Sequence, residues 1–363
     1  MTGRLRVTAR LTVMARLTSP GRPRGLRGSS RPENLVPAVS VLIVIVAFLC
    51  TPLINGSGLT TFDVYNTLQG FARLGLLALG LGITMIAGEF DLSVAGTYAA
   101  GGMIAVQAGQ SSAALGILAA VAAGAAIGTV QGGLIASLRI PSLPVTLATY
   151  IALLGLTSAM SGGLSVTYTN TGVTLAVDRS IAGVLSVPSL ITLAAFAIAA
   201  LVFGRTRLGR EIRAIGGDRR ASRVAGVRVG RTLVGLFGVS GALAALGGAL
   251  LSYGYASANP NPGLQPLILA AVACLVGGVS LAGGRGLPAG LLAGTLAVAL
   301  LGQIDAMTAL PDYYTELLYA ALLMVIVAID APGLRRGLSR LRARDKSIRR
   351  ETTNAGGGQG GPA

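Results

Sequence analysis

Two nearby carboxylates, Glu89 and Asp91, are the side chains of this sequence that most invite a chemical interpretation. They follow an apolar run of membrane-spanning length, and a carboxylate at the edge of a span is costly to place there. Such groups contact solutes or ions in transport pathways, so both residues, with the neighbouring Ser93, are candidates for a translocation path. A structural alternative stays open, in which Asp91 caps the helix that begins at Ser93.

The sequence lacks the residues that most enzyme sites require. It contains no histidine, which removes the usual proton carrier and the commonest metal ligand. Its single lysine, Lys346, follows Asp345, so the G-x-x-x-x-G-K-[ST] phosphate-binding loop cannot occur. Its two cysteines, Cys50 and Cys274, lie far apart in apolar runs and offer neither a disulfide framework nor a metal-ligand spacing. We therefore predict no enzyme, no metal site and no cofactor, and an ATPase that drives this protein must be another polypeptide.

Long apolar segments are the elements that must position these side chains. Hydrophobic residues make up 52% of the 363 residues and charged residues only 12%, which is about half the charged share of a typical soluble domain. A helix needs about 20 mostly apolar residues to cross a bilayer. The composition therefore predicts an all-α, polytopic integral membrane protein with about ten transmembrane helices. The expected spans are 35–54, 68–87, 93–109, 113–137, 143–162, 184–204, 231–252, 265–280, 286–304 and 313–331.

Basic residues gather in three segments around these spans. Of the 29 Lys and Arg residues, 8 fall in 1–34, 9 in 205–231 and 8 in 332–363. Such clusters are what the positive-inside rule produces, and the expected spans place all three on one side of the membrane. The net charge of +16 is therefore expected to orient the protein and to meet anionic lipid. Nucleic acid is not an expected partner, because its binding would need interleaved aromatics or a recognised binding fold.

This arrangement predicts three parts of the chain. Residues 1–34 form a basic cytoplasmic N-terminal tail, 35–331 a transmembrane domain, and 332–363 a cytoplasmic tail that is basic and then disordered. We expect a multi-pass protein of the cell membrane with both termini in the cytoplasm. Two alternatives stay open for the N-terminal tail, since its composition also resembles a transit peptide and Met14 is a possible true start.

Two sets of glycines repeat at four-residue spacing, which places each set on one face of a helix. Such a face lets a neighbouring backbone approach closely, and close packing must supply the cohesion between helices in lipid. We therefore assign helix packing to Gly124, Gly128 and Gly132 in one ladder, and to Gly286, Gly290 and Gly294 in the other.

A weak internal repeat accompanies the ladders. The stretches 87–93 (AGEFDLS) and 276–282 (VGGVSLA) share a Gly-x-x-x-Leu frame after an apolar run, with Gly88 aligned to Gly277. Glycine-interrupted hydrophobic segments in matching positions of two halves are typical of transporters and point toward the translocation path. The sequence therefore predicts two pseudo-repeated halves, and Ser280 of the second half joins the translocation-path candidates.

The segment 205–230 is too polar to cross a membrane, yet its apolar residues recur with helical spacing on either side of Gly216 and Gly217. This pattern predicts two short helices on the cytoplasmic face, joined by a glycine break. A simple linker would not need two apolar faces, so we interpret the segment as a docking surface, with an ordinary solvated loop as the alternative. The apolar residues are Leu208, Ile212, Ile215, Ala221 and Val224.

Four ordered stretches make the chain resemble the membrane permease family of ABC importers for ribose, xylose, arabinose and galactosides. They are Ile83–Gly96 (ITMIAGEFDLSVAG), Ile140–Leu156 (IPSLPVTLATYIALLGL), Thr206–Gly226 and Ala270–Gly286 (AAVACLVGGVSLAGGRG). The stretches cover both halves of the chain, and only the two tails look unrelated to the family.

The resemblance implies a ten-span subunit that pairs with a second permease, as a homodimer or heterodimer, and with two cytoplasmic ABC ATPase subunits that bind ATP. An extracytoplasmic sugar-binding protein would deliver the solute. It also implies that 206–226 holds a coupling helix that inserts into a groove of the ATPase. The positions on this motif are Gly209, Arg210, Ala214, Gly216, Gly217, Ala221 and Gly226.

The sequence departs from the family pattern in two places. Asp218 replaces the usual asparagine, and Arg219 and Arg220 stand where acidic residues are common, which suggests a partner groove with compensating acidic charge. Glu89 stands where a second glycine is usual, which puts the usual turn geometry in question.

The predicted function is import of a simple sugar, of the pentose or hexose class, by alternating access driven by a separate ATPase. The first alternative is the same architecture with a non-sugar solute, such as an autoinducer-like furanose, a polyol or a nucleoside. An ion-coupled secondary transporter is disfavoured, because it would need titratable residues within its spans. A membrane enzyme is disfavoured because no nucleophile–base or metal constellation occurs.

Overall fold

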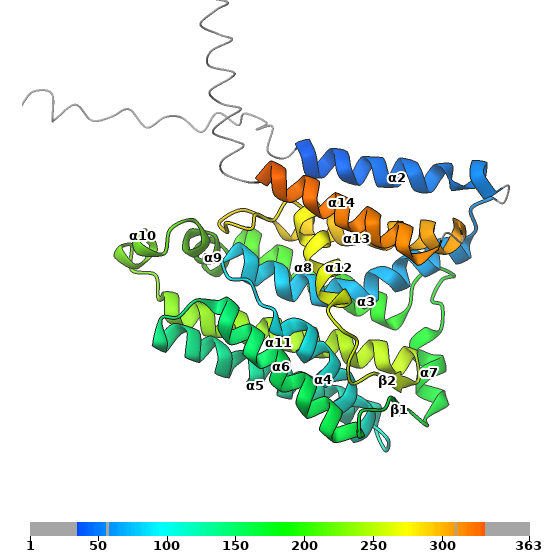
Figure 1. Ribbon diagram of the computed structural model, residues 1–363, viewed down its shortest axis with the longest axis horizontal. Helices are drawn as coiled ribbons and strands as arrows, with labels where there is room; N and C mark the ends of the chain where they lie inside the picture. The colour runs from blue at the N-terminus through cyan, green and yellow to red at the C-terminus, as the bar shows by residue number, and fades with distance from the viewer. Residues whose placement is uncertain (1–34, 56–57, 309–310, 331–363) are drawn as a thin grey trace, which may run out of the picture. The chain divides into compact units, whose positions relative to one another are not determined.

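The computed structural model describes residues 35–55, 58–308 and 311–330 of the chain. The predicted tails, 1–34 and 332–363, lie outside the described residues. The described part is mostly α-helical, in agreement with the all-α prediction (Figure 1). It also contains a small antiparallel sheet, in which β1 (Val166–Thr167) pairs with β2 (Ser257–Ala258).

A helix overlaps each of the ten predicted spans, and three shorter helices lie between them. The long elements are α2 (Leu35–Asn55), α3 (Thr61–Ile86), α4 (Ser93–Ala108), α5 (Ala113–Leu138), α6 (Ser142–Ser161), α8 (Val187–Arg205), α11 (Val229–Gly254), α12 (Gln265–Val276), α13 (Pro288–Thr308) and α14 (Asp312–Asp330). The short ones are α7 (Thr171–Asp178), α9 (Arg207–Gly217) and α10 (Arg219–Val224).

Six helices in the described part are long and apolar enough to cross a membrane: α3, α5, α6, α8, α11 and α13. By contrast, α4 has 16 residues and α12 only 12, so each is shorter than the roughly 20 residues of a full span. The described part is therefore a multi-pass membrane protein, and the count of ten spans stays a prediction.

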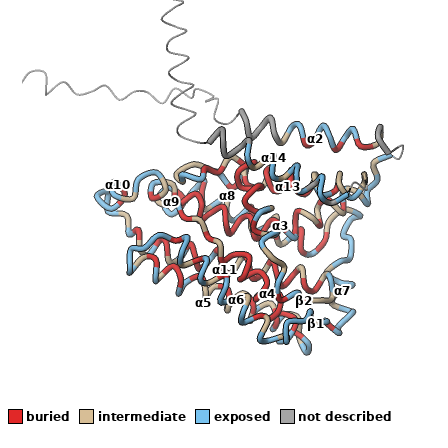
Figure 2. Tube along the Cα trace, viewed as in Figure 1, coloured by how far each residue is buried: buried red, intermediate tan, exposed pale blue. Residues whose placement is uncertain are grey.

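The helices α3 and α11 form the centre of the helical packing. Helix α11 packs against α3, α4 and α5, whereas α3 also packs against α8, α12 and α13. Buried positions follow the same elements in Figure 2. In the most apolar 18-residue stretch of α3, 89% of the residues are buried, whereas only 22% are buried in the corresponding stretches of α5 and α6. The outer faces of α5 and α6 thus offer apolar side chains to lipid or to another subunit.

The first glycine ladder faces α11. A Cβ atom at Gly124 or Gly128 would collide with the carbonyl oxygens of Gly241 or Phe237, and one at Gly132 would lie 2.9 Å from the Cβ of Phe237. By contrast, Gly133 has open space around its Cβ position. Close packing of the α5 backbone on the α11 backbone therefore requires glycine, which has no side chain, at the three ladder positions.

The second ladder is shorter than predicted. Gly290 and Gly294 lie on α13 and face α12, where a Cβ on either would collide with the backbone of Gly277 or Ala273. The assignment of Gly286 to the same helical face is wrong, because α13 begins only at Pro288. Gly286 adopts φ +138° in the preceding loop, a conformation that side chains disfavour. Proline suits a helix start because it has no N–H to leave unpaired there.

Candidate functional site

We call residues 87–92, between α3 and α4, the first helix break. It begins with a Schellman motif at the end of α3. The N–H of Gly88 donates to the carbonyl of Met85 at 2.9 Å, and the N–H of Glu89 donates to the carbonyl of Thr84 at 3.0 Å. Gly88 has φ +81°, the left-handed conformation that this motif requires at its first position beyond the helix. Glu89 needs no positive φ, so its replacement of the second glycine leaves the turn intact.

The second helix break, residues 277–287 between α12 and α13, begins with the same Schellman motif. The N–H of Gly278 donates to Leu275 and the N–H of Val279 to Cys274, both at 3.0 Å, with φ +79° at Gly278. The two breaks are thus equivalent at Gly88 and Gly278. The sequence alignment of Gly88 with Gly277 was wrong by one residue, because the helix end sets the register and the Gly-x-x-x-Leu frame does not.

The two breaks are in contact with one another. The N–H of Gly284 donates to the carbonyl of Ile86, the last residue of α3, at 2.9 Å. A Cβ at Gly283 would lie 2.6 Å from the Cα of Gly88. The loop after α12 therefore closes over the C-terminus of α3 and satisfies one of its orphan carbonyls.

The segment 205–230 forms two short helices, as predicted, with the break in a different place. Gly216 and Gly217 both lie within α9, and the chain turns at Asp218. The carboxylate of Asp218 accepts from the backbone N–H of Arg220 at 2.8 Å and of Ala221 at 2.9 Å. Asp218 therefore serves as the N-cap of α10, a role that asparagine fills equally well.

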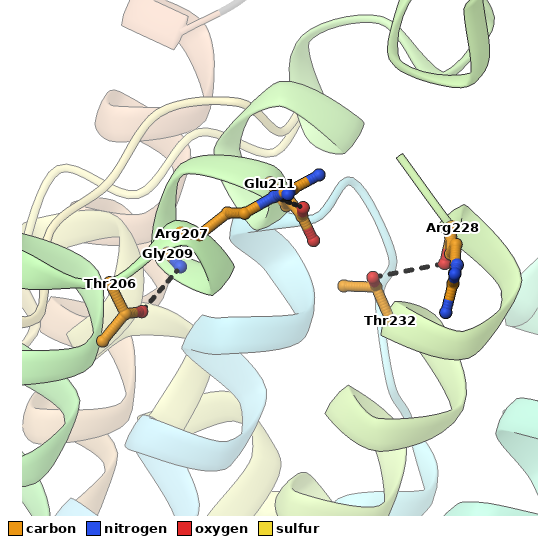
Figure 3. Close-up of polar contacts among 6 residues, drawn as sticks. All are labelled: Thr206, Arg207, Gly209, Glu211, Arg228 and Thr232. Carbon is orange, nitrogen blue, oxygen red and sulfur yellow. Dashed lines mark hydrogen bonds and ion pairs between the residues drawn. The ribbon is translucent and has the colours of Figure 1, made fainter. Parts of the chain in front are cut away.

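Local hydrogen bonds also fix the start of α9 (Figure 3). The side chain of Thr206 accepts from the N–H of Gly209 at 3.4 Å, and Arg207 pairs with Glu211 one turn later at 2.6 Å. A Cβ at Gly209 would collide with the backbone of Phe203 at the end of α8. Gly209 thus sets how closely α9 folds back on α8.

The inner face of α9 seats on the helix breaks. Ile212 and Ile215 are each 1% exposed. A Cβ at Gly216 would collide with the carbonyl oxygen of Ile86 and with the nitrogen of Gly284. The backbone of Gly216 therefore contacts both breaks. We call the set of Ile86, Gly88, Gly216, Gly283 and Gly284 the glycine junction.

The remaining predicted coupling residues face outward or end the segment. Arg210, Ala214, Gly217 and Ala221 are exposed, and Val224 beside them is 85% exposed. A Cβ at Gly217 would meet nothing within 4 Å. Gly226 has φ +83° and ends α10.

Glu89 pairs with Arg219 across this interface. Glu89 Oε1 and Arg219 Nη2 form an ion pair between the first break and α10, and Glu89 is only 5% exposed. Burial and the neighbouring Arg223 lower the pKa of the Arg219 guanidinium, but an arginine still remains a cation at neutral pH. Arg219 therefore has a partner inside the protein. Of the two neighbouring arginines, Arg219 and Arg220, only Arg220 is fully exposed.

Asp91 holds three helices together. Its Oδ1 accepts from the N–H and hydroxyl of Ser93 at 3.0 and 2.5 Å and from Gln131 of α5 at 3.1 Å. Its Oδ2 accepts from Ser240 of α11 at 3.2 Å. The N-cap of α4 is Leu92, so Asp91 is not the cap itself, although it accepts from the N–H of Ser93, the first residue of the helix. Its contacts with Gln131 and Ser240 were missed. A lone amide between Gly128 and Gly132 of an apolar helix was the available signal.

The role of the other candidates in a solute path stays a prediction. Asp91 and Ser93 are enclosed by protein, at 1% and 2% exposed. The Oγ of Ser280 accepts from the N–H of Ala282 at 3.3 Å and from Arg285 at 3.1 Å, within the loop of the second break. In the conformation described, all three order the helix breaks.

The sequence matches known transport proteins along most of its length. A family model described as the permease component of the branched-chain amino acid transport system matches residues 64–327. The ribose import permease of Escherichia coli strain K12 is 30% identical over 297 residues, which are 80% of this chain and 91% of that protein. The L-arabinose ABC transporter permease of Azospirillum brasilense is 30% identical over 295 residues, 80% of this chain and 86% of that protein.

A third relative is more distant. The xylose transport system permease of E. coli strain K12 is 26% identical, over 82% of this chain and 92% of that protein. No solved structure matches the chain. The family match begins within α3 and ends within α14, so it includes both helix breaks and the segment 205–230. The chain belongs to this family of membrane permeases, and it is a transporter subunit, not an enzyme.

Proposed function

We propose that this protein is the membrane subunit of an ABC importer for a simple sugar, driven by a separate cytoplasmic ATPase and supplied by a binding protein outside the membrane. The observation that carries the cargo class is the set of relatives named for ribose, L-arabinose and xylose, each aligned over at least 80% of this chain. The family description names branched-chain amino acids, so an amino acid is the competing cargo.

The glycine junction supports a route for coupling ATP hydrolysis to transport. Because Gly216 touches Ile86 and Gly284 at backbone distance, α9 cannot move toward the membrane without displacing the ends of both breaks. The Glu89–Arg219 pair adds a second link between the same elements. Packed backbones shift between discrete arrangements and do not deform continuously, so a push on α9 is passed on to α3 and to the loop before α13.

The outward face of α9 and α10 is the proposed docking surface for the ATPase. Its residues are small or flexible at Ala214, Gly217 and Ala221, and cationic at Arg210 and Arg220. Small residues let a coupling helix enter a groove deeply, and the two arginines favour a groove with acidic residues. The predicted coupling motif thus has inward positions that seat the segment and outward positions that are free for a partner.

The proposed topology has ten spans, with both termini, α9 and α10 in the cytoplasm. Six helices precede α9 in the long-helix order and four follow α10, which returns the chain to the side rich in arginine. The exposed apolar faces of α5 and α6 lie toward lipid or toward the second permease of the pair. Homodimer and heterodimer both satisfy this arrangement.

Reconstituted transport tests the cargo class directly. The full-length permease is assembled in liposomes with an ABC ATPase subunit and a sugar-binding protein from the same organism, and ATP-dependent uptake of labelled ribose, arabinose, xylose and leucine is compared. Uptake of at least one sugar supports the proposal. Uptake of leucine without any sugar overturns the cargo class, and uptake driven by an ion gradient without ATP overturns the importer type.

A further inference from the structure

Three arginines lie at one end of the helix pair formed by α5 and α11. Arg139 directly follows the last residue of α5, whereas Arg228 precedes α11 and Arg231 lies in its first turn. The two helices are in contact at this end, because a Cβ at Gly230 would lie 3.7 Å from the Cβ of Ala136. Arg228 and Arg231 are three positions apart and so lie on one side of α11. All three arginines are exposed, and we call them the arginine cluster.

No carboxylate of the described residues pairs with the arginine cluster. The sequence has no Asp or Glu between Asp91 and Asp178 or between Asp218 and Asp305, and the cluster lies within these two stretches. Two of its arginines also lie at the N-terminal end of α11, where cations oppose the helix macrodipole. The cluster is therefore a concentration of positive charge that an anion from outside the chain would stabilise.

Arg139 adopts a backbone conformation that arginine disfavours. Its φ of 55° and ψ of 34° are left-handed, and glycine is the usual residue at a helix end of this kind because a β-carbon is strained there. Among the described residues other than glycine, only Ala182 and Ala256 share a positive φ. Strained backbone positions cluster at functional sites. Because the backbone would prefer glycine, the reason for an arginine at this position lies in its side chain.

An exposed apolar face of α5 leads to the arginine cluster. Val130, Leu134 and Leu138 repeat at four-residue spacing and are 64%, 45% and 61% exposed, so they share a face about 12 Å long. Leu134 lies about 200° around the helix from Gly132 of the glycine ladder, on the side away from α11. A cationic end on an exposed apolar helix face matches a phospholipid, whose phosphate lies at the membrane surface and whose acyl chains extend into the bilayer.

We propose that the arginine cluster binds the headgroup phosphate of an anionic phospholipid, with an acyl chain along the apolar face of Val130, Leu134 and Leu138. A guanidinium can donate two parallel N–H bonds to phosphate oxygens, and no carboxylate of the described residues competes for these donors. A zwitterionic phospholipid fits less well, because its ammonium group is repelled by the arginines. An acidic segment of the ATPase would leave the apolar face uncovered, so we assign the cluster to lipid and not to that partner.

The position of the site gives the lipid a role beyond general attraction to the membrane surface. Helix α10 ends at Val224, and Arg228 follows four residues later. A lipid bound here anchors the chain that connects α10 to α11, beside the proposed docking surface for the ATPase. This inference rests on the proposed topology, in which α5 ends and α11 begins at the cytoplasmic surface, where basic sites between membrane helices bind anionic headgroups.

The test measures lipid binding to the full-length permease, purified in a neutral detergent, by native mass spectrometry. The probes are dioleoylphosphatidylglycerol, which is anionic, dioleoylphosphatidylcholine, which is zwitterionic, and inorganic phosphate. Arg139→Gly is the main variant, because glycine suits the left-handed backbone and removes only the side chain. Arg231→Gln is a second variant that leaves that backbone unchanged. Arg205→Gln is the matched control, since Arg205 is an exposed arginine at the end of another spanning helix, α8.

We expect wild-type protein to retain phosphatidylglycerol in preference to phosphatidylcholine. The Kd for phosphatidylglycerol should rise about tenfold in Arg139→Gly and in Arg231→Gln, the usual loss for one hydrogen bond to a charged group, and stay within about twofold of wild type in Arg205→Gln. Without added lipid, Arg139→Gly should unfold at the wild-type temperature or above it, because glycine relieves the strained backbone.

Several outcomes would overturn the site. Equal retention of the two phospholipids, or an unchanged Kd in both Arg139→Gly and Arg231→Gln, removes the arginine cluster as a headgroup site. An equal loss in Arg205→Gln means that the permease attracts lipid only through its overall charge. Displacement of phosphatidylglycerol by inorganic phosphate means that the cluster binds free anions. The assay contains neither ATPase nor sugar, so its failure is distinct from a failure of the proposed importer function, which the uptake experiment tests.

Discussion

Gly216 of α9 lies against Ile86, the last residue of α3, so closely that the glycine has no room for a β-carbon. The two residues are 130 positions apart in the chain, yet the carbonyl of Ile86 also accepts the hydrogen bond from Gly284. One peptide carbonyl is therefore shared by α9 and both helix breaks. We propose that movement of the ATPase is transmitted to the membrane helices through this contact.

Substitution of Gly216 by alanine should uncouple the importer. The new methyl group collides with the backbone atoms of Ile86 and Gly284, which cannot rotate away as a side chain can, so α9 must lift from the junction. Overpacking of this kind costs about 1–3 kcal/mol. We expect ATP hydrolysis to persist and sugar uptake per ATP to fall, measured in proteoliposomes with the binding protein present.

Gly217→Ala is the matched control. Its methyl group would meet no atom within 4 Å, and alanine is favoured over glycine in a helix by about 0.5–1 kcal/mol. Gly217 belongs to the proposed docking surface, but alanine is as small as Ala214 and Ala221 on the same surface, so uptake per ATP should stay at the wild-type value. Equal uncoupling by the two alanines would show that helix propensity or partner contact, and not the seat on Ile86, is what matters.

The contrast between these two glycines also shows where sequence reasoning stops. Amphipathic spacing was sufficient to predict α9 and α10, because it depends on residues near one another in the chain. Neither glycine could be assigned an inward or outward role, because that depends on Ile86 and Gly284, which other helices bring to the site. The same limit explains why Gln131 and Ser240 were not recognised as partners of Asp91.

Helix ends account for the remaining errors. The repeat was aligned by its letters, with Gly88 opposite Gly277, whereas the turn geometry requires a left-handed residue directly after the cap and so pairs Gly88 with Gly278. Gly286 was counted in a helical ladder because it fits the four-residue spacing. Pro288 starts the helix later, and periodicity alone cannot detect such a start.

Removal of the Glu89 charge should loosen α10 from the first break. Glu89→Gln leaves Arg219 without its anion, and Arg219→Gln leaves a buried carboxylate unpaired. We expect each to lower the free energy of unfolding by about 1–2 kcal/mol, less than for a fully buried pair because water reaches Arg219. Thermal unfolding in detergent measures the loss.

The double variant distinguishes a direct pair from two separate effects. If the charges interact, Glu89→Gln combined with Arg219→Gln costs less than the sum of the single losses. Losses that add within about 0.5 kcal/mol would contradict a direct interaction. Arg220→Gln is the control, since Arg220 is exposed and should leave stability unchanged.

The glycine ladder of α5 predicts a position-dependent response to alanine. Gly128→Ala forces a methyl group into the carbonyl of Phe237, so α5 and α11 must separate. We expect a loss of about 1–3 kcal/mol, measured as a lower unfolding temperature. Gly133→Ala, only five residues away in open space, should be neutral or slightly stabilising. A loss at Gly133 as large as at Gly128 would mean that glycine serves flexibility in α5 and not close packing.

The outward face of α9 should accept a large residue without harm to the fold, but not without harm to assembly. Ala214 is exposed while Ile212 and Ile215 on the opposite side are buried, so Ala214→Trp adds bulk only where the ATPase is proposed to dock. We expect an unchanged unfolding temperature and loss of the co-purified ATPase subunit. Ala176→Trp is the control, because Ala176 is also exposed. It lies on α7, which the proposed topology places on the other side of the membrane from α9, since the spanning helix α8 separates them. A tryptophan in a groove shaped for alanine must displace the partner. Retention of the ATPase by Ala214→Trp, or its loss in Ala176→Trp, would therefore contradict a docking surface on α9.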